Sequence, residues 1–304
     1  MACFMATALK QQPLIPKISC NTMLRNLLKC LHPRFQALFL EYKVTFKPRY
    51  GHGMPAHPRL LEIIAENRAE YGDWMHKILA QREHLQSIKK LNAETDPTQP
   101  GWNNHFLPGL DIMALYTIIA ETKPKRYVEV GSGNSTQVAH KAVQDHDLDT
   151  RIISIDPFPR AAIDNLADEV IRQPFEAVDS NWLSELEAGD ILFIDNSHRI
   201  LPNSDSTVFF LETLPALKPG VLVHIHDVYL PFDYPQFMCD RFYTEQYGLA
   251  INLLANAKRY QTIFPAYYIS EDEALRGIIS EIWEHPNLQD VERHGGSYWL
   301  RIGQ

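Results

Sequence analysis

The residues best suited to chemistry stand at the ends of short apolar runs in the middle of the chain. One run leads directly into Gly131-Ser132-Gly133, and the next ends at Asp156. Glycines let the backbone approach a ligand, and in an open parallel sheet ligands bind at the carboxyl ends of the strands, beside the first strand-to-helix turn. Asp156 can accept hydrogen bonds from ribose hydroxyls. The combination predicts a site for an adenosyl or dinucleotide ligand, whereas the glycines alone would also fit a tight structural turn.

A second group of polar side chains closes two later apolar runs. Asp195 ends one run and is followed by His198, while Asp227 ends the other and is preceded by His224 and His226. Strand alternation puts these last two histidines on one face, so up to three imidazoles are expected beside two carboxylates. An imidazole can take a proton from a hydroxyl, and two carboxylates with an imidazole can instead hold a divalent cation. A lone buried histidine would be a core residue, but several convergent imidazoles and carboxylates favour a reactive site.

The elements that position these groups follow from the alternation of short apolar runs with helical patterns. Such alternation predicts βαβ units and a mostly parallel sheet, and therefore an α/β fold. Pro235 suits the first turn of a helix, and the Lys218-Pro219-Gly220 turn suits the end of another. The expected strands are residues 127–130, 151–155, 190–194, 221–225, 260–264 and 297–302, and the expected helices are residues 109–121, 135–145, 206–217, 235–247 and 273–283.

The first third of the chain has a different pattern. Residues 57–91 carry apolar side chains at helical spacing, which predicts two helices that break near Gly72. A polar stretch with prolines follows at residues 92–104 and indicates a loop. These helices are expected to form a lid or platform ahead of the main domain.

Three parts of the chain are therefore expected. A leader and basic amphipathic segment spans residues 1–48, a helical extension or lid spans 49–108, and the main domain spans 109–304. The basic apolar stretch at residues 23–42 would fit a membrane-surface helix. Because amphipathic helices more often pack on their own domain, membrane contact is not expected.

Composition and charge narrow the class of partner. The chain has 304 residues, of which 45% are hydrophobic and 22% charged, as in a folded globular protein. The formal net charge of −8 provides no electrostatic footprint for nucleic acid, so a small-molecule or glycan-like partner is expected. The four cysteines form no CxxC pair, so neither a zinc ribbon nor a disulfide framework is indicated, and a cytoplasmic location is expected. The sequence leaves open whether the chain forms a homo-oligomer.

Several segments carry a family resemblance. They resemble, in order, the motifs of class I S-adenosylmethionine-dependent methyltransferases: VEVGSGNST, ISIDP, GDILFIDNSH and LKPGVLVHIHDVY. With RYGHGMPAHPRL and WNNHFLPGLD, the pattern is similar to bacterial methyltransferases of glycan and natural-product pathways, over about residues 49–303. The resemblance implies a Rossmann-like, mostly parallel seven-stranded sheet with helices on both faces and a last antiparallel strand. A Rossmann dehydrogenase fits less well, because Thr136 takes the last position of GxGxxG.

The resemblance also implies a cofactor site. It places Glu129, Gly131 and Gly133 at the amino-acid end of S-adenosylmethionine, and Asp156 at its ribose. Ser135 stands where many members of the family have a third glycine. The implied cofactor-binding residues are Glu129, Gly131, Ser132, Gly133, Asn134, Ser135, Asp156 and Asp195.

The predicted catalytic residues are His226, His198, Asp195 and Asp227, with an imidazole as the base for a hydroxyl acceptor. Related O-methyltransferases bind magnesium through acidic residues at these strand ends, which implies Asp195, His226 and Asp227 as ligands of magnesium or another divalent cation. His226 stands where a carboxylate is more typical, so a metal-free base mechanism is a second expectation. Two rivals stay open: a metal-dependent hydrolase or oxygenase that uses this cluster alone, and a non-catalytic protein that binds an adenosyl ligand.

Overall fold

The computed structural model describes residues 32, 36–159 and 163–304 of the chain. Residues 36–45 form no helix or strand and are exposed, while most of the expected leader lies outside the described residues. In the part of the chain that is described, no helix is long and apolar enough to cross a membrane.

The chain divides into two units, Met1–Thr45 and Phe46–Gln304. The helical extension expected at residues 49–108 lies in the second unit together with the main domain expected at 109–304. The second unit holds every strand described below.

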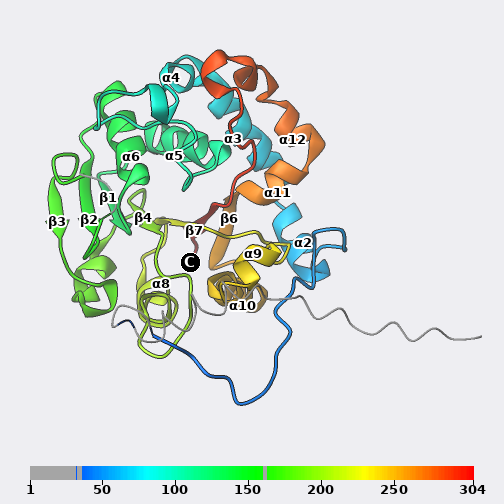
Figure 1. The fold of residues 1–304 in the computed structure, drawn as a ribbon. Helices are drawn as coiled ribbons and strands as arrows, with labels where there is room; N and C mark the ends of the chain where they lie inside the picture. Colours follow the sequence, from blue (N-terminus) through cyan, green and yellow to red (C-terminus); the bar gives the residue numbers. More distant parts are fainter. Residues whose placement is uncertain (1–31, 33–35, 160–162) are drawn as a thin grey trace, which may run out of the picture. The chain divides into compact units, whose positions relative to one another are not determined.

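A seven-stranded sheet organises this second unit (Figure 1). Its spatial order is β3-β2-β1-β4-β5-β7-β6. The strands from β3 to β5 are parallel to their neighbours, and β7 runs antiparallel to both β5 and β6. The mostly parallel sheet and the antiparallel last strand expected from the class I methyltransferase resemblance are confirmed. The strands are β1 (Arg126–Val130), β2 (Arg151–Ile155), β3 (Glu169–Ile171), β4 (Ile191–Ile194), β5 (Leu222–Ile225), β6 (Tyr260–Pro265) and β7 (Tyr298–Ile302).

Helices cover both faces of the sheet. Figure 1 shows α5 and α6 on one side and α8 and α10 on the other. Almost every residue of α5 up to Ala120 is buried, because α5 packs against both α3 and α6. The principal helices are α2 (Pro58–Ala65), α3 (Arg68–Ala80), α4 (Arg82–Ser87), α5 (Gly109–Thr122), α6 (Asn134–Asp145), α7 (Asp205–Val208), α8 (Leu214–Ala216), α9 (Gln236–Cys239), α10 (Glu245–Asn256), α11 (Ala266–Glu271) and α12 (Glu273–Gly277). The short helical turns are η1 (Leu91–Ala93), η2 (Phe175–Ala177), η3 (Ser180–Glu185), the π-helical η4 (Phe209–Thr213), η5 (Ser280–Glu284) and η6 (Pro286–Leu288).

The break expected near Gly72 is wrong. Helix α3 continues through this glycine, because its neighbours Tyr71 and Trp74 are buried in the core and tertiary packing outweighs the low helix propensity of glycine. The chain breaks earlier, at Asn67, whose side-chain amide donates a 3.1 Å hydrogen bond to the carbonyl oxygen of Thr262 in β6. A contact with a distant strand therefore sets the boundary.

The single helix expected over residues 235–247 is also wrong, since α9 and α10 are separate. Between them Phe242 adopts a φ of 60°, a left-handed conformation that does not continue a helix. The backbone amides of Thr244 and Glu245 then donate to the carbonyl oxygen of His198, at 2.9 and 3.3 Å. The break thus carries the start of α10 to the end of β4. Two other expected helices are also divided into shorter pieces. Residues 206–217 form α7, η4 and α8, and residues 273–283 form α12 and η5.

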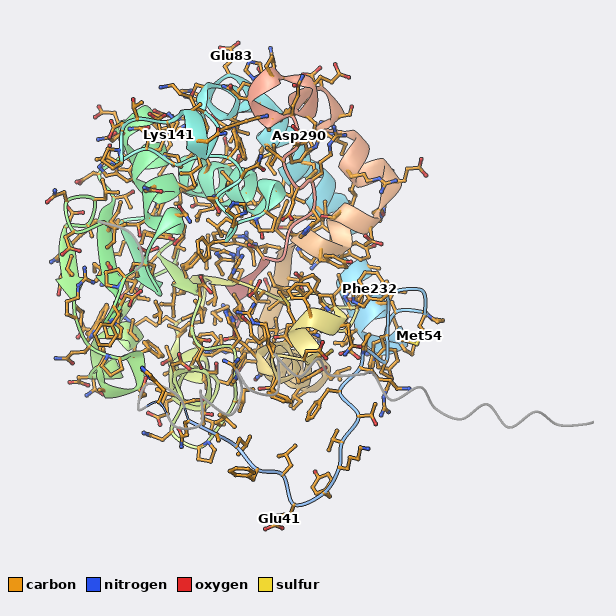
Figure 2. All side chains as sticks on the ribbon, in the orientation of Figure 1. Glu41, Met54, Glu83, Lys141, Phe232 and Asp290 are labelled. Atoms are coloured by element: carbon orange, nitrogen blue, oxygen red, sulfur yellow. The ribbon has the colours of Figure 1, made fainter. Side chains whose placement is uncertain are left out.

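A loop near the start of the second unit is fastened to the turn after β5. The Asp233 carboxylate accepts a 2.7 Å hydrogen bond from the backbone amide of Arg49. Gly51 has a φ of 72°, and a Cβ atom there would come within 2.7 Å of the Phe232 side chain; Figure 2 shows Phe232 beside the loop that carries Met54. Glycine is therefore required where the loop touches the domain.

Candidate active site

The glycine loop joins the end of β1 to the start of α6. Gly131 has a φ of 82°, and a Cβ atom at this position would clash with the carbonyl oxygen of Asp195 at the end of β4. Gly133, by contrast, has an extended φ, and a Cβ atom there would meet nothing within 4 Å. The loop therefore packs tightly against β4 at its first glycine and leaves open space at its second.

A cavity of about 310 Å³ opens at this loop, and cavities of this size hold small-molecule ligands. Asp156 stands in its wall at the end of β2, where its two oxygens accept hydrogen bonds from the amides of Ser132 (2.9 Å) and Phe158 (2.7 Å). Each oxygen keeps lone-pair capacity for a ligand hydroxyl, so the carboxylate and the open glycine fit an adenosyl cofactor. Of the predicted cofactor residues, the cavity is lined by Gly131, Ser132, Gly133, Asn134, Ser135, Asp156 and Asp195.

Glu129, the remaining predicted cofactor residue, lies beneath the loop and not in the cavity wall. Its fully buried carboxylate accepts hydrogen bonds from the hydroxyls of Ser135 at 2.9 Å, Tyr127 at 3.3 Å, and Thr136. Burial raises the pKa of Glu129 to about 7, although these hydroxyls act in the opposite direction. In this conformation Glu129 braces the loop, and its direct contact with the cofactor stays a prediction.

The segment before α5 contributes to the wall of the same cavity. Asn104, Phe106 and Leu107 line the cavity, while Trp102 is fully buried as a packed anchor. Phe158 also lines the cavity and is 86% exposed. Phe158 was not predicted as a site residue, although its position two residues after Asp156 was a usable signal.

A second cavity, of about 850 Å³, adjoins the first. Asp195 and Phe106 stand in the walls of both. The second cavity is also lined by His198, His226 and Asp227. The structure therefore brings together all four predicted catalytic residues, from the ends of β4 and β5, at the place where the two cavities meet.

Within this group two imidazoles face two carboxylates. His198 Nε2 lies 3.2 Å from Asp195 Oδ1 and 3.5 Å from Asp227 Oδ2. His226 Nδ1 lies 3.6 Å from Asp195 Oδ1 and 3.7 Å from Asp227 Oδ1. We call these four side chains the strand-end cluster.

His224 does not belong to the strand-end cluster, so two imidazoles converge and not three. It is fully buried, stacked on Trp299 with ring centroids 4.5 Å apart and edge-on to Phe193 at 4.3 Å. Burial holds the pKa of His224 well below 6.5, so its ring is neutral. His224 is therefore a core residue, as a lone buried histidine was expected to be.

Each imidazole of the cluster has a fully buried carboxylate at its other nitrogen. Glu245 Oε2 lies 3.0 Å from His198 Nδ1, and Asp111 Oδ2 lies 3.6 Å from His226 Nε2. Asp111 also accepts a 2.7 Å hydrogen bond from the amide of Gly296. Sequence reasoning missed both carboxylates as site residues, because each stands in the first turn of a helix far along the chain from its histidine.

The neighbouring carboxyl groups raise the pKa of both imidazoles. Burial alone would lower the pKa of His198, but hydrogen bonds to Asp195 and Glu245 raise it well above 6.5. The pKa of His226 is also raised well above 6.5 against the effect of burial, first by the charge of Asp227 and then by the neighbouring carboxyl groups. Burial acts to raise the pKa of Asp195, but the two neighbouring imidazoles outweigh it and lower that pKa. The arrangement therefore favours proton uptake by the imidazoles and stabilises the charged form of each ring.

Strained backbone gathers around the second cavity. Left-handed φ values cost a non-glycine residue about 1–2 kcal/mol, and such strain clusters at functional sites. The lining residues with a φ between 53° and 67° are His52, Asn103, His105, His198, Asp227 and Asp290. This concentration supports a functional role for the cavity that is independent of the charges in it.

No metal site is evident in the described ranges 36–159 and 163–304. Nowhere in them do three or more His, Cys, Asp or Glu side chains stand in an arrangement that could hold a metal ion. The expectation that Asp195, His226 and Asp227 bind magnesium or another divalent cation therefore stays a prediction without support from their geometry.

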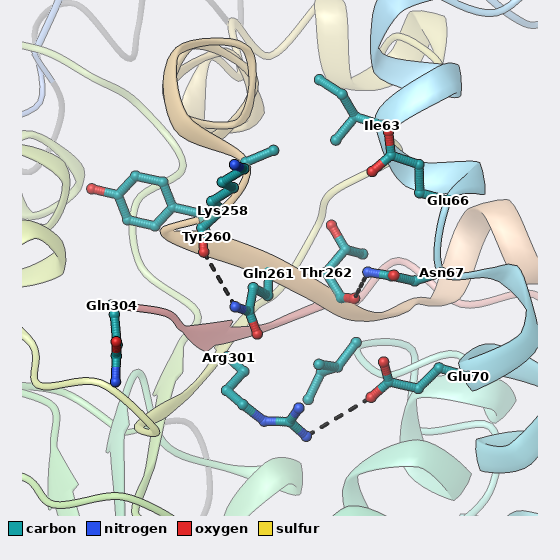
Figure 3. Close-up of a pocket in the computed structure, with 12 residues that line it drawn as sticks. Ile63, Glu66, Asn67, Glu70, Lys258, Tyr260, Gln261, Thr262, Arg301 and Gln304 are labelled. Carbon is teal, nitrogen blue, oxygen red and sulfur yellow. Dashed lines mark hydrogen bonds and ion pairs between the residues drawn. The ribbon is translucent and has the colours of Figure 1, made fainter.

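A third cavity, of about 620 Å³, lies at the opposite edge of the sheet (Figure 3). Its wall includes the first residues of β6 and an ion pair between Arg301 and Glu70 at 3.8 Å. Because β6 runs in the same direction as β5, these first residues lie at the amino edge, away from the strand ends that carry Asp195 and Asp227. Its described lining includes none of the predicted site residues, so it is not the candidate active site.

Comparisons with known proteins were made against families, curated proteins and solved structures. Residues 128–228 match the model of a family described as a methyltransferase domain, whereas no curated protein matches the chain. The SAH-bound methyltransferase PaMTH1 of Podospora anserina is 15% identical with a TM-score of 0.40, over 84% of this chain and 100% of that one. The plantazolicin methyltransferase BpumL in complex with SAH is 14% identical with a TM-score of 0.37, over 80% and 99%. MycE of the mycinamycin biosynthetic pathway, in complex with Mg, SAH and mycinamycin VI, is 16% identical with a TM-score of 0.35, over 61% and 47%.

Proposed function

We propose that this chain, a class I methyltransferase by its motifs, its sheet order and its family match, transfers a methyl group from S-adenosylmethionine to a hydroxyl oxygen. The acceptor is a small molecule or a glycan-like compound. The observation that carries the proposal is the meeting of two cavities at Asp195, one built around the glycine loop and one around the strand-end cluster. A donor and an acceptor can therefore approach each other at one carboxylate.

The first cavity is proposed to hold the cofactor, which when bound supplies a methyl group activated on a positively charged sulfur. Asp156 accepts hydrogen bonds from the ribose hydroxyls with the lone pairs that the amides of Ser132 and Phe158 leave free. Gly133 leaves room for the amino-acid end. Asp195 stands at the passage between the cavities, where its negative charge favours a cationic group.

The second cavity is proposed to hold the acceptor, with an imidazole of the strand-end cluster as the proton acceptor. Methyl transfer to oxygen requires the hydroxyl to lose its proton, and a positioned imidazole can take it. Asp195 and Asp227 then stabilise the imidazolium that forms, because each lies within 3.7 Å of an imidazole nitrogen. We favour an oxygen acceptor over nitrogen because this cluster is suited to deprotonation.

A divalent cation is a second, less supported element of the proposal. If Asp195, His226 and Asp227 held a divalent cation, it would lower the pKa of the acceptor hydroxyl, so that the hydroxyl would lose its proton more easily. The experiment below therefore includes magnesium as a separate condition.

The test is calorimetric titration with S-adenosylmethionine and with S-adenosylhomocysteine, each with and without magnesium. We expect micromolar dissociation constants for the unchanged chain. Asp156→Ala should weaken binding at least about tenfold, the equivalent of one or two lost hydrogen bonds. Asp149→Ala is the matched control, since this exposed aspartate lies before β2 at the opposite edge of the sheet. Absence of binding in every condition would refute the cofactor, and equal affinities for the two variants would refute the site.

Two rival functions make different predictions. A metal-dependent hydrolase or oxygenase would turn over its substrate with a metal and without an adenosyl cofactor. A non-catalytic binding protein would bind the cofactor but be indifferent to His226→Ala and His198→Ala. The methyltransferase-domain match favours neither.

A further inference from the structure

We infer that the acceptor carries a polyol ring, such as a sugar unit, and that the Tyr229 hydroxyl binds one of its hydroxyls next to the one that is methylated. The inference rests on the proposed function and deepens it, because it names the class of acceptor and a residue that selects it. It comes from side chains of the second cavity to which no role has been assigned above.

One wall of the second cavity is aromatic. Four rings from separate segments of the chain form what we call the aromatic wall: His52, Tyr229, Tyr267 and His294. Tyr267 is at its centre, with the ring centroids of the other three between 4.7 and 6.4 Å away. The face of a tyrosine ring is apolar and electron-rich, and the hydroxyl at its tip is polar. Such a wall can therefore bind the C–H groups on one side of a ring as well as a polar substituent.

Tyr229 is the member of the aromatic wall with a buried and unpaired hydroxyl. Its side chain is only 5% exposed, yet its hydroxyl makes no hydrogen bond to any described residue. The tyrosines that are completely buried all engage their hydroxyls in hydrogen bonds within the described chain, and these are Tyr71, Tyr116, Tyr127, Tyr234 and Tyr298. Because Tyr229 lines the cavity, a molecule inside the cavity can supply the missing partner.

The backbone holds Tyr229 beside the strand-end cluster. Its amide donates a 2.9 Å hydrogen bond to the side-chain oxygen of Gln246, which is fully buried. A Cβ atom built on Gly296 would lie 3.8 Å from the Tyr229 hydroxyl oxygen and 3.9 Å from the Cα atom of Asp227, so the hydroxyl and the end of β5 are neighbours across this glycine. A ring bound to Tyr229 can therefore present an adjacent hydroxyl to the strand-end cluster.

Carboxylates in the same cavity favour an acceptor with several hydroxyls. Glu271, Asp290 and Glu292 line it in addition to the strand-end cluster, and each carboxylate oxygen can accept hydrogen bonds from hydroxyls. The volume of about 850 Å³ is in the range of sites for drug-sized ligands, so it fits a sugar unit joined to a further group. A polyol ring matches the aromatic faces, the Tyr229 hydroxyl and the carboxylates together, whereas a phenol with a single hydroxyl matches only the first two.

The first experiment measures binding of methyl α-glucopyranoside to the full chain with S-adenosylhomocysteine bound, by saturation-transfer NMR. The variant is Tyr229→Phe, which removes only the hydroxyl. Tyr260→Phe is the matched control, because Tyr260 is 7% exposed, makes no hydroxyl hydrogen bond to a described residue and lines the third cavity (Figure 3). We expect millimolar dissociation constants for the unchanged chain and the control, and about tenfold weaker binding in Tyr229→Phe, as for one lost hydrogen bond. Tyr267→Leu should abolish saturation of the ring C–H protons, because it removes the central ring.

The second experiment uses the analogues of the glucoside that each lack one hydroxyl. One of them should bind the unchanged chain about tenfold more weakly than the parent glucoside. The same analogue and the parent should bind Tyr229→Phe equally, because the partner of the missing hydroxyl is already gone. A merely structural effect of the substitution would weaken binding of all the analogues alike.

Equal affinities of Tyr229→Phe and the unchanged chain for the glucoside and every analogue would overturn the role of Tyr229. The acceptor class would be overturned by absence of glucoside binding, or by tighter binding of catechol, a planar phenol, or of tyramine, a cationic phenol. Failure of the proposed function is a separate result, since it appears as absence of S-adenosylhomocysteine binding. The glucoside is then titrated into the chain alone, where the comparison of Tyr229→Phe with Tyr260→Phe still tests the aromatic wall. Because Tyr229→Phe keeps the ring, the test remains valid if Tyr267→Leu fails to fold.

Discussion

Replacing the two glycines of the loop one at a time separates its structural role from its ligand-binding role. In Gly131→Ala the new Cβ atom meets the Asp195 carbonyl oxygen, and the backbone has a φ of 82°. The left-handed conformation costs about 1–2 kcal/mol once a Cβ is present, and forcing an atom into a packed contact costs about 1–3 kcal/mol more. The free energy of unfolding should therefore fall by about 2–5 kcal/mol.

The two terms can be measured separately with a second glycine. Gly189 has a φ of 90°, but a Cβ atom there would meet nothing within 4 Å. Gly189→Ala should therefore show the conformational cost alone, about 1–2 kcal/mol. Urea unfolding followed by circular dichroism gives both values, and their difference measures the clash with β4. An equal loss of stability in Gly131→Ala and Gly189→Ala would refute the close approach of the loop to Asp195.

Gly133→Ala should have the opposite profile. Its φ of 166° lies outside the left-handed region and its surroundings are open, so the free energy of unfolding should fall less than in Gly131→Ala. The added methyl group projects into open space at the cavity wall, and affinity for S-adenosylhomocysteine should fall about tenfold or more. Calorimetry on this variant decides the point: normal affinity would mean that the space beside Gly133 is not where the cofactor lies.

Three further predictions concern buried polar groups. Glu129→Gln should remove a pH dependence of stability, because the pKa of Glu129 is raised to about 7 from 4.5. The stabilisation by the protonated carboxyl group is complete below pH 4.5 and is lost as the pH rises through 7, on the order of 3 kcal/mol. Chemical unfolding at pH 5 and 8 tests this, and an equal pH dependence in the variant and the unchanged chain would refute it. Arg126→Met should cost about 3 kcal/mol in urea unfolding, because it removes the cation that pairs with the buried Asp190 carboxylate and leaves it the backbone amides of Arg126 and Glu187. Arg59→Met, in an exposed ion pair, should have no measurable effect, and similar losses in the two variants would contradict this reasoning. His224→Phe should raise the melting temperature or leave it unchanged, since both buried ring nitrogens lack hydrogen bonds in the described chain, and a large loss of stability or of cofactor affinity would show that His224 is more than a core residue.

The strand ends could be predicted from the sequence because their signals are local. A glycine loop directly after an apolar run, or an aspartate directly after another, needs only the sheet topology to place it, and parallel strands all end at one edge. Gly131, Asp156, Asp195 and Asp227 are therefore found at that edge, in the cavities where they were expected. The same reasoning put His224 of β5 and His226, which follows that strand, on one face, but it could not tell that His224 would be covered by Trp299 from β7.

Helix boundaries were harder to predict, because tertiary contacts decide them. Gly72 lies inside α3 since the helix buries aromatic side chains on both sides of it. The end of α9 depends on the left-handed turn at Phe242, which delivers the start of α10 to the backbone of His198. A pattern of apolar spacing contains no information about either partner. The wrong boundary at residues 235–247 also explains why Glu245 was not predicted as a site residue. In one continuous helix it would not have stood in a first turn, where α10 places it beside His198.

The partners of the two imidazoles could not be predicted from local sequence patterns. His198 and Glu245 are 47 positions apart, and Asp111 approaches His226 from the start of α5. Four carboxyl groups thus surround two imidazoles, so acidic groups outnumber basic ones even with both rings protonated. Two of the four, Asp111 and Glu245, are fully buried. Burying like charges without compensation is costly. That cost is reduced when a cation or a transferred proton occupies the site, and a methyl donor with a positive sulfur beside Asp195 would supply such a charge. The arrangement is therefore easier to understand as a site for a cationic ligand than as a stabilising feature of the fold.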